Sequence, residues 1–157
     1  MSNKGFTLIE MLVAIAILSV LLGVAVLNLP KFLRVYKYKE DVFQVEMVIK
    51  NAKLKAMERT TNVIVCVDNN KTLRVVDVGT DRGSRNCNGN TLYTVNLSSF
   101  SNFDTTTGTG FRFMFDPRGL AVVAGNVCLS NGEVFTKFRV QDNAGRILIE
   151  RGSGTCN

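Results

Sequence analysis

A chain of 157 residues has room for one domain of ordinary size and one additional element. It carries a net charge of +6 and contains no histidine, which excludes a Ser/His or Cys/His catalytic dyad and an imidazole-based metal site. No glycine-rich phosphate loop opens a helix, so the sequence predicts a protein that is not an enzyme and needs no cofactor or metal.

The stretch Met11–Leu29 is apolar except for Ser19, Gly23 and Asn28. At a rise of about 1.5 Å per residue it forms a helix of roughly 30 Å, the thickness of a bilayer core. A core helix would show a polar face, and a cleaved signal would have a shorter apolar stretch and a small-residue cleavage site. We therefore expect a short basic leader, then a transmembrane helix that is retained in the mature protein, and an exported domain after it.

Basic residues are concentrated directly after this apolar stretch. Lys31, Arg34 and Lys37 recur at helical spacing, where anionic lipid headgroups of the inner membrane would attract them. A solvated helix face would explain the same charges. Both interpretations place this segment at the boundary between the membrane and the exported domain.

The helical pattern continues beyond the membrane segment. Apolar residues step by three or four and form one stripe, which predicts a single helix from Thr7 to about Arg59. Pro30 predicts a kink or local melting. The stripe consists of Val35, Tyr38, Val42, Val45, Ile49, Ala52 and Ala56.

From Thr61 onward the pattern changes to the period of two that is typical of strands. Residues 98–110 are rich in Ser and Thr and predict a loop. The fold class is therefore α+β, with the long helix packed on an antiparallel sheet. The expected strands cover residues 63–67, 73–78, 92–97, 111–115, 120–123, 127–129 and 134–141, and a last one carries Ile147 and Ile149.

Four cysteines lie in the part expected outside the membrane. An even number in an exported domain favours disulfides, and no C-x-x-C spacing supports a metal site. Of the three possible pairings the sequential one is favoured, because each bond would close a polar loop or fix a terminal segment. It joins Cys66 to Cys87 and Cys128 to Cys156.

Glu10 is a carboxylate at the start of the apolar stretch. An ionised side chain deep in a bilayer costs at least about 2.5–3.5 kcal/mol, so such a group is expected to have a partner. Alternatively, a position near the helix start allows the side chain to reach the headgroup region. The residues alone leave both interpretations open.

Residues 4–13 read K-G-F-T-L-I-E-M-L-V. This segment resembles the class III leader and helix start shared by type IV pilins and type II secretion pseudopilins. The resemblance implies that prepilin peptidase cleaves between Gly5 and Phe6 and that the new amine of Phe6 is methylated. Residues 1–5 are then the leader, residues 6–30 the transmembrane helix and residues 31–157 the exported domain. It also implies that Glu10 docks the subunit against other pilins or pseudopilins, with its carboxylate near the Phe6 ammonium of a neighbouring subunit.

A second resemblance covers residues 111–156 and suggests the GspH/FimT branch. That branch holds the minor pseudopilin of type II secretion and related minor pilins of type IV pili. The implied function is a structural subunit held in the inner membrane, with its C-terminal domain in the periplasm, that then enters a pseudopilus or pilus. The matching pieces are F-x-F-D-P-R-G from Phe113, C-L-S from Cys128, G-R-I from Gly145 and the terminal Cys156.

DNA binding during natural transformation is the alternative function. Some FimT-type minor pilins bind DNA through a Gly-Arg motif followed by a second Arg, and Gly145-Arg146 lacks that second Arg. Nearby acidic residues leave only a small local excess of positive charge. The candidate DNA-binding residues are Arg112, Lys137, Arg139 and Arg146.

Overall fold

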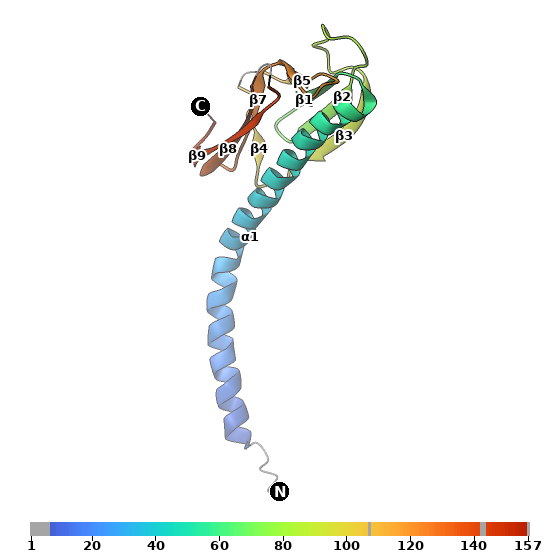
Figure 1. Cartoon of the computed structure of the whole chain (residues 1–157). Coiled ribbons are helices and arrows are strands. Elements are labelled where there is room, and N and C mark those ends of the chain that lie inside the picture. Colours follow the sequence, from blue (N-terminus) through green and yellow to red (C-terminus); the bar gives the residue numbers. More distant parts are fainter. Residues whose placement is uncertain (1–6, 107, 142–143, 157) are drawn as a thin grey trace, which may run out of the picture. The chain divides into compact units, whose positions relative to one another are not determined.

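A computed structural model describes residues 7–106, 108–141 and 144–156, without the side chains of residues 24, 25, 27 and 28. The chain divides into two compact units, residues 1–36 and residues 37–157. A long N-terminal helix is followed by antiparallel strands, which confirms the α+β class (Figure 1).

Helix α1 (Leu8–Arg59) contributes to both units, with bounds close to the predicted ones. At its start, the backbone N–H of Glu10 lies 3.2 Å from the carbonyl oxygen of Thr7 and 3.4 Å from Thr7 Oγ1. Such a threonine cap satisfies a donor that the first turn of a helix leaves unpaired. The helix ends where Thr60 adopts a left-handed φ of 52°.

The first unit contains the apolar half of α1. The helix is continuous through Pro30, where the sequence predicts a kink or local melting. Among the described residues no helix offers a stretch both long and apolar enough to cross a membrane. The predicted membrane helix over residues 6–30 is therefore not confirmed. Within that range, residue 6 and the side chains of residues 24, 25, 27 and 28 lie outside the described part.

The second unit contains two antiparallel sheets, where the sequence predicts one. Sheet A has the order β3-β2-β1-β5-β6 and sheet B the order β4-β7-β8-β9. Sheet A consists of β1 (Val63–Val67), β2 (Thr72–Asp77), β3 (Asn90–Asn96), β5 (Gly110–Phe115) and β6 (Ala121–Val123). Sheet B consists of β4 (Asn102–Phe103), β7 (Gly125–Ser130), β8 (Val134–Val140) and β9 (Ile147–Ser153).

The chain visits sheet B once for the short strand β4, returns to sheet A for β5 and β6, and then crosses to sheet B again at Ala124, between β6 and β7. Gly125 permits this crossing, because a Cβ at that position would lie 2.0 Å from the carbonyl oxygen of Arg112 on β5. Only a glycine allows two backbones to approach so closely. The sheets therefore meet where β7 passes β5.

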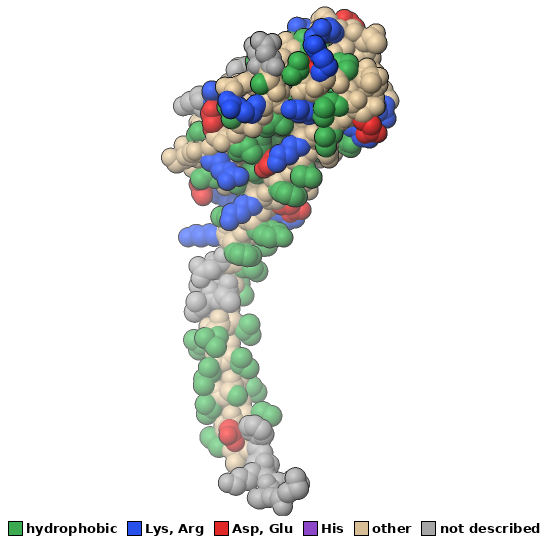
Figure 2. All heavy atoms as spheres, viewed as in Figure 1, with side chains coloured by type: hydrophobic (Ala, Val, Ile, Leu, Met, Phe, Trp, Pro, Cys, Tyr) green, Lys and Arg blue, Asp and Glu red, His purple; other side chains and the backbone are tan. Residues whose placement is uncertain are grey.

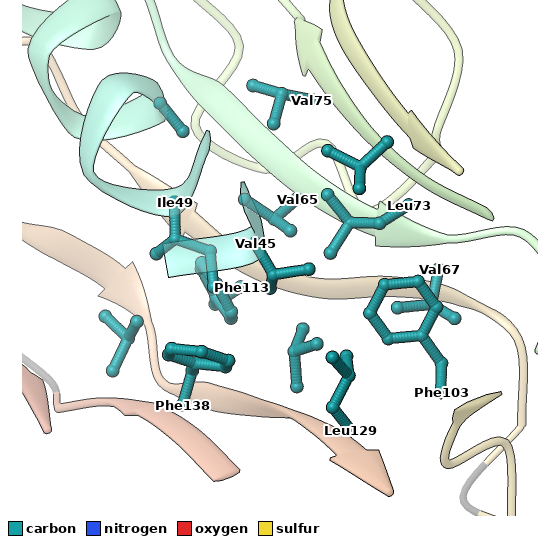
Figure 3. Close-up of a cluster of buried hydrophobic side chains, with 14 of the residues drawn as sticks. Val45, Ile49, Val65, Val67, Leu73, Val75, Phe103, Phe113, Leu129 and Phe138 are labelled. Atoms are coloured by element: carbon teal, nitrogen blue, oxygen red, sulfur yellow. The ribbon is translucent and has the colours of Figure 1, made fainter. Parts of the chain in front are cut away.

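The main core lies between the second half of α1 and both sheets. Val45 and Ile49 are fully buried and point among side chains of the two sheets (Figure 3). Phe113 of sheet A and Phe138 of sheet B are equally buried. Six of the seven residues of the predicted stripe are buried here, whereas Val35 in the first unit is 46% exposed.

A smaller apolar cluster covers the opposite face of sheet A. Its buried members are Ile64, Cys66, Val76 and Met114, and the half-buried Val78 and Cys87 of the β2–β3 loop pack on them. Sheet A is therefore apolar on both faces, with the helix on one and a loop on the other. This explains why β1 is buried at every position.

Candidate assembly site

Glu10 lies in the first turn of α1, and its side chain is exposed. A carboxylate in the first turn is stabilised by the partial positive charge of the helix N-terminus. Gly5 and Phe6, the predicted processing residues, lie outside the described residues. The structure therefore describes the position of Glu10, whereas its predicted assembly role and the predicted processing site stay predictions from the sequence.

The residues that follow Glu10 form an apolar surface on every side of the helix. All described side chains from Leu8 to Gly23 are exposed, and large ones such as Leu12, Ile15 and Leu18 are each more than half exposed. Figure 2 shows apolar side chains along the visible face of this segment. An apolar surface of this extent is unfavourable in water, so it marks a region that lipid or other protein chains cover.

Comparison with known families identifies this end of the chain. The family model described as the prokaryotic N-terminal methylation motif matches residues 1–26. The chain carries a prepilin-type N-terminus. No curated protein and no solved structure is similar enough to count as a match.

The prepilin-type N-terminus supports a pilin-like protein and points to a structural subunit without catalytic function. It suggests membrane anchoring at the N-terminus and implies processing by prepilin peptidase and assembly with other pilins. The motif and the exposed apolar helix surface around Glu10 both lie in the first unit.

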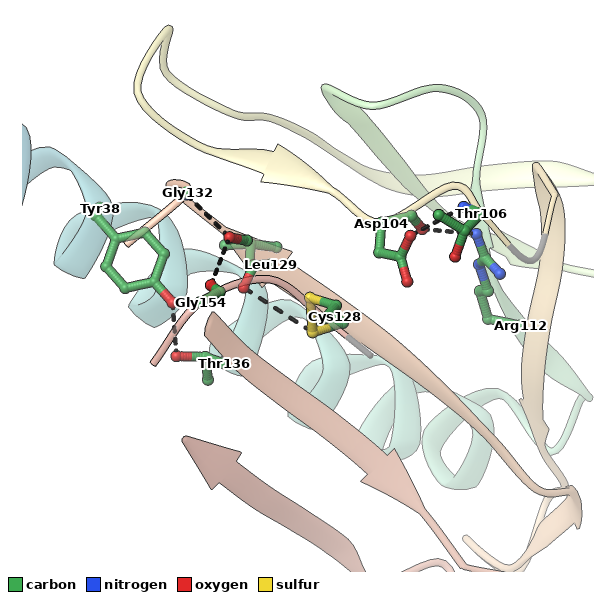
Figure 4. The surroundings of a disulfide bond; sticks show 11 residues. Tyr38, Asp104, Thr106, Arg112, Cys128, Leu129, Gly132, Thr136 and Gly154 are labelled. Carbon is green, nitrogen blue, oxygen red and sulfur yellow. Dashed lines mark hydrogen bonds between the residues drawn. A yellow bond between two sulfur atoms is a disulfide. The ribbon is translucent and has the colours of Figure 1, made fainter. Parts of the chain in front are cut away.

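The second unit carries two disulfides, in the pairing that the sequence favours. Cys66 is bonded to Cys87 and Cys128 to Cys156, each with a Cα–Cα distance of 6.1 Å. Cys66 lies on the face of sheet A away from the main core and fixes the β2–β3 loop there. Cys128 fixes the C-terminal tail to β7 in the same way (Figure 4).

The four candidate DNA-binding residues do not form one exposed basic group. Arg112 is partly buried, and its Nη2 donates to the carbonyl oxygens of Asp104 at 3.2 Å and Gly108 at 2.6 Å. Burial lowers the pKa of Arg112, although Asp104 opposes this effect. Arg112 therefore holds the loop before β5, a structural role that the sequence does not indicate (Figure 4).

The other three candidates belong to β8 and the turn before β9. Lys137 lies 6.0 Å from the ring centre of Phe135, and Arg139 Nη1 lies 3.3 Å from Glu150 Oε1. Arg146 Nη2 donates to Gln141 Oε1 at 2.8 Å. Each of these cations has a local partner, and DNA binding remains an untested prediction.

Asp116 is a buried carboxylate that organises the turn after β5, a role that sequence reasoning did not identify. Its Oδ1 accepts the backbone N–H groups of Arg118 at 2.9 Å and Leu120 at 3.0 Å. Its Oδ2 accepts the guanidinium groups of Arg118 at 2.8 Å and Arg82 at 3.3 Å. Burial by itself would raise the pKa of Asp116, but the hydrogen bonds from the Arg118 side chain and from the backbone N–H groups of Leu120 and Arg118 outweigh it and lower the pKa.

The D-P-R-G sequence indicates the turn and the Arg118 contact, since an Asp side chain commonly bonds the backbone two residues further on. The Arg82 contact joins residues 34 positions apart, so no local signal could reveal it. Asp116 thereby links the turn after β5 to the β2–β3 loop that Cys87 also fixes.

Proposed function

We propose that this protein is a minor pseudopilin or minor pilin of the GspH/FimT type. It is a structural subunit that assembles into the pseudopilus of type II secretion or into a type IV pilus. The observation that carries the proposal is the methylation motif at the head of an apolar helix that is exposed on every described side.

In this proposal prepilin peptidase removes residues 1–5, and the new Phe6 amine is methylated. Residues 6–30 anchor the chain in the inner membrane, with residues 31–157 in the periplasm. The two disulfides support an exported domain, because such bonds persist in oxidising compartments. Lys31 and Arg34 follow the anchor and suit contact with anionic lipid headgroups.

Glu10 selects and positions the next subunit. In lipid its carboxylate lacks a hydrogen-bonding solvent, and the Phe6 ammonium of a neighbouring subunit would remove that cost. Pairing of two such groups in a medium of low dielectric constant favours one axial offset between helices over others. The exposed apolar side chains then pack against other helices once the subunit leaves the lipid.

The test uses full-length protein produced in its own host. Mass spectrometry should find an N-terminus at methylated Phe6, and Gly5→Leu should retain the leader. Glu10→Gln keeps the side-chain shape but removes the charge, so we expect normal processing and at least about a tenfold loss of the subunit from sheared filaments. Glu46→Gln is the matched control, because Glu46 is also on α1 and pairs with Lys50.

Normal incorporation of the Glu10→Gln subunit would refute the assembly mechanism, and an unprocessed N-terminus in the wild-type protein would refute the family assignment. Deletion strains separate the two systems. A type II pseudopilin affects the release of secreted proteins, whereas a minor pilin affects the number of surface pili.

A further inference from the structure

The two sheets of the second unit have four edges, and three of them are poorly suited to pairing with another chain. Strands β4 and β6 contain only two and three residues. Strand β3 has a register shift opposite Val75 and Val76 of β2. Short strands and bulges are the usual means by which proteins protect sheet edges.

Strand β9 is the exception. It has seven residues, and its register with β8 runs without a shift from Val134↔Ser153 to Val140↔Ile147. It is the outer strand of sheet B, and the tail that follows it is bonded through Cys156 to β7, two strands away. The free edge of β9 is therefore a regular one.

The backbone groups on that edge can be assigned from the bonds at the two ends of the β8–β9 ladder. The N–H of Gln141 donates to the carbonyl of Arg146 at 3.2 Å, and the N–H of Gly154 donates to that of Glu133 at 2.7 Å. Bonded pairs alternate along an antiparallel ladder, so the even-numbered residues of β9 bond to β8. Ile147, Ile149 and Arg151 consequently direct their N–H and C=O groups outward.

The side chains of this edge form a self-complementary sequence, R-I-L-I-E, centred on Leu148. Ile147 and Ile149 lie on the core side, opposite Val140 and Phe138 of β8. Leu148 and Glu150 lie on the other side, opposite Arg139 and Lys137. Ile149 is 37% exposed, although it lies on the core side.

We propose that β9 pairs antiparallel with β9 of a second copy of this chain, about a two-fold axis at Leu148. This register sets Leu148 opposite the second copy's Leu148 and each Ile147 opposite an Ile149. Arg146 then lies opposite the second copy's Glu150, twice by symmetry. Opposite charges and apolar side chains in directly facing positions both stabilise an antiparallel pair.

The same backbone groups are satisfied by this arrangement. Ile147 and Ile149 face each other across the axis with their outward N–H and C=O groups, which is the bonded type of pair. Sheet B then continues as one sheet of eight strands through the two copies, and neither copy retains β9 as a free edge.

Neighbouring registers are less favourable, which selects the one centred on Leu148. A pair centred on Glu150 would set two carboxylates directly opposite each other, and one centred on Arg151 would do the same with two guanidinium groups. A pair centred on Ile149 would face each Ile147 with an Arg151, and one centred on Ile147 would face each Leu148 with an Arg146, so that charged side chains face apolar ones. Like charges in facing positions are destabilising.

The existing partners of the two charges do not prevent the new contacts. Arg146 uses one of its five N–H groups on Gln141, and the Glu150 carboxylate can accept from both Arg139 and the second copy's Arg146. A pair with a chain that lacks this sequence would set neither an acidic group opposite Arg146 nor a further basic group opposite Glu150. A second copy is therefore the occupant that the strand fits.

Cysteine cross-linking of the full-length chain in detergent tests the register. Leu148→Cys adds a single thiol beside the two native disulfides, and facing non-bonded residues lie about 4.5 Å apart at Cα, within reach of a disulfide. Ser153→Cys is the control, because the two copies of residue 153 would lie about 30 Å apart. We expect at least about tenfold more cross-linked dimer from Leu148→Cys, and equal yields would overturn the proposal.

Charge reversal tests the pairing independently. Arg146→Glu and Glu150→Arg, each alone, place like charges opposite each other and should raise the dimer dissociation constant about tenfold. The double variant restores opposite charges and should bring the constant back close to the wild-type value. A double variant as weak as the single ones would overturn the proposal, provided that its disulfides are intact by mass spectrometry.

This dimer does not rest on the proposed function. Its contacts lie entirely within the second unit, so Glu10→Gln should leave the Leu148→Cys cross-link unchanged. Failure of filament assembly and failure of β9 pairing are thereby observed in separate experiments.

Discussion

Replacement of Asp116 by Asn tests whether one buried carboxylate organises the turn between β5 and β6. The Asn oxygen can still accept the backbone N–H groups of Arg118 and Leu120, which lie at 2.9 Å and 3.0 Å in the wild-type protein. Its NH₂ group cannot accept the guanidinium groups of Arg118 and Arg82. The variant therefore isolates the contribution of the two charge-assisted contacts.

The magnitude follows from the exposure of the partners. A hydrogen bond to a charged group contributes about 1.5–3 kcal/mol, but the side chains of Arg118 and Arg82 are 66% and 58% exposed and regain water when released. After this discount we expect a loss of about 1–2 kcal/mol in the free energy of unfolding. For a chain of this size that lowers the melting temperature by roughly 2–8 °C.

The pH dependence provides the sharper assay. The folded state lowers the pKa of Asp116, so its contribution is complete above the ordinary Asp value of about 3.9. It is lost as the pH falls through the lowered pKa of the folded state. The stability difference between wild type and Asp116→Asn should be constant from about pH 7 to pH 5 and should shrink toward pH 2.

Thermal unfolding of the full-length chain in detergent, followed by circular dichroism at several pH values, measures this difference. Asp81→Asn is the control, because Asp81 is exposed and accepts the backbone N–H of Gly83, two residues away, at 2.8 Å. We expect a change of at most about 0.5 kcal/mol for that variant. A difference for Asp116→Asn that persists undiminished at the lowest pH would refute the electrostatic explanation.

Three further predictions concern other contacts of the second unit. Cys128→Ser with Cys156→Ser opens a loop of 28 residues and should cost about 3–4 kcal/mol, measured by denaturant unfolding. Gly145→Ala should lower the melting temperature strongly, since a Cβ there would lie 2.0 Å from the carbonyl oxygen of Gly119. Lys71→Met removes donors to three loop carbonyls and should speed amide exchange in residues 98–101.

The helix could be predicted because its signal is local, and the disulfides because four cysteines allow only three pairings. The apolar stripe fixes α1 by its period, and the charged side chains on the other faces agree with it. Alternation of side chains along β1 determines which face of sheet A carries Cys66. Val65 and Val67 face the main core, so Cys66 faces the other side. Only a segment that crosses that outer face can supply its partner, and the loop with Cys87 does so.

The division into two sheets could not be predicted, because it depends on contacts between distant residues. Residues 98–110 lack periodicity, yet Phe103 is buried and pairs with Leu129 of β7 as part of β4. A strand of two residues is too short for a periodic pattern to appear. Its existence follows from the core space that Phe103 fills, which only the folded chain defines.

The assembly role of Glu10 stays a prediction, and it rests on a physical signal that one sequence can carry. Glu10 stands out because a carboxylate conflicts with the apolar residues around it, and such a conflict within one sequence marks a candidate functional position. The β9 edge was missed because each residue of R-I-L-I-E suits an ordinary outer strand. Its self-complementarity becomes visible only when the strand is known to be the free edge of its sheet and its outward backbone groups are assigned. A charged residue within an apolar stretch can be recognised from the sequence of one chain. The self-complementarity of a strand can be recognised only when the structure shows which of its edges and side chains face outward.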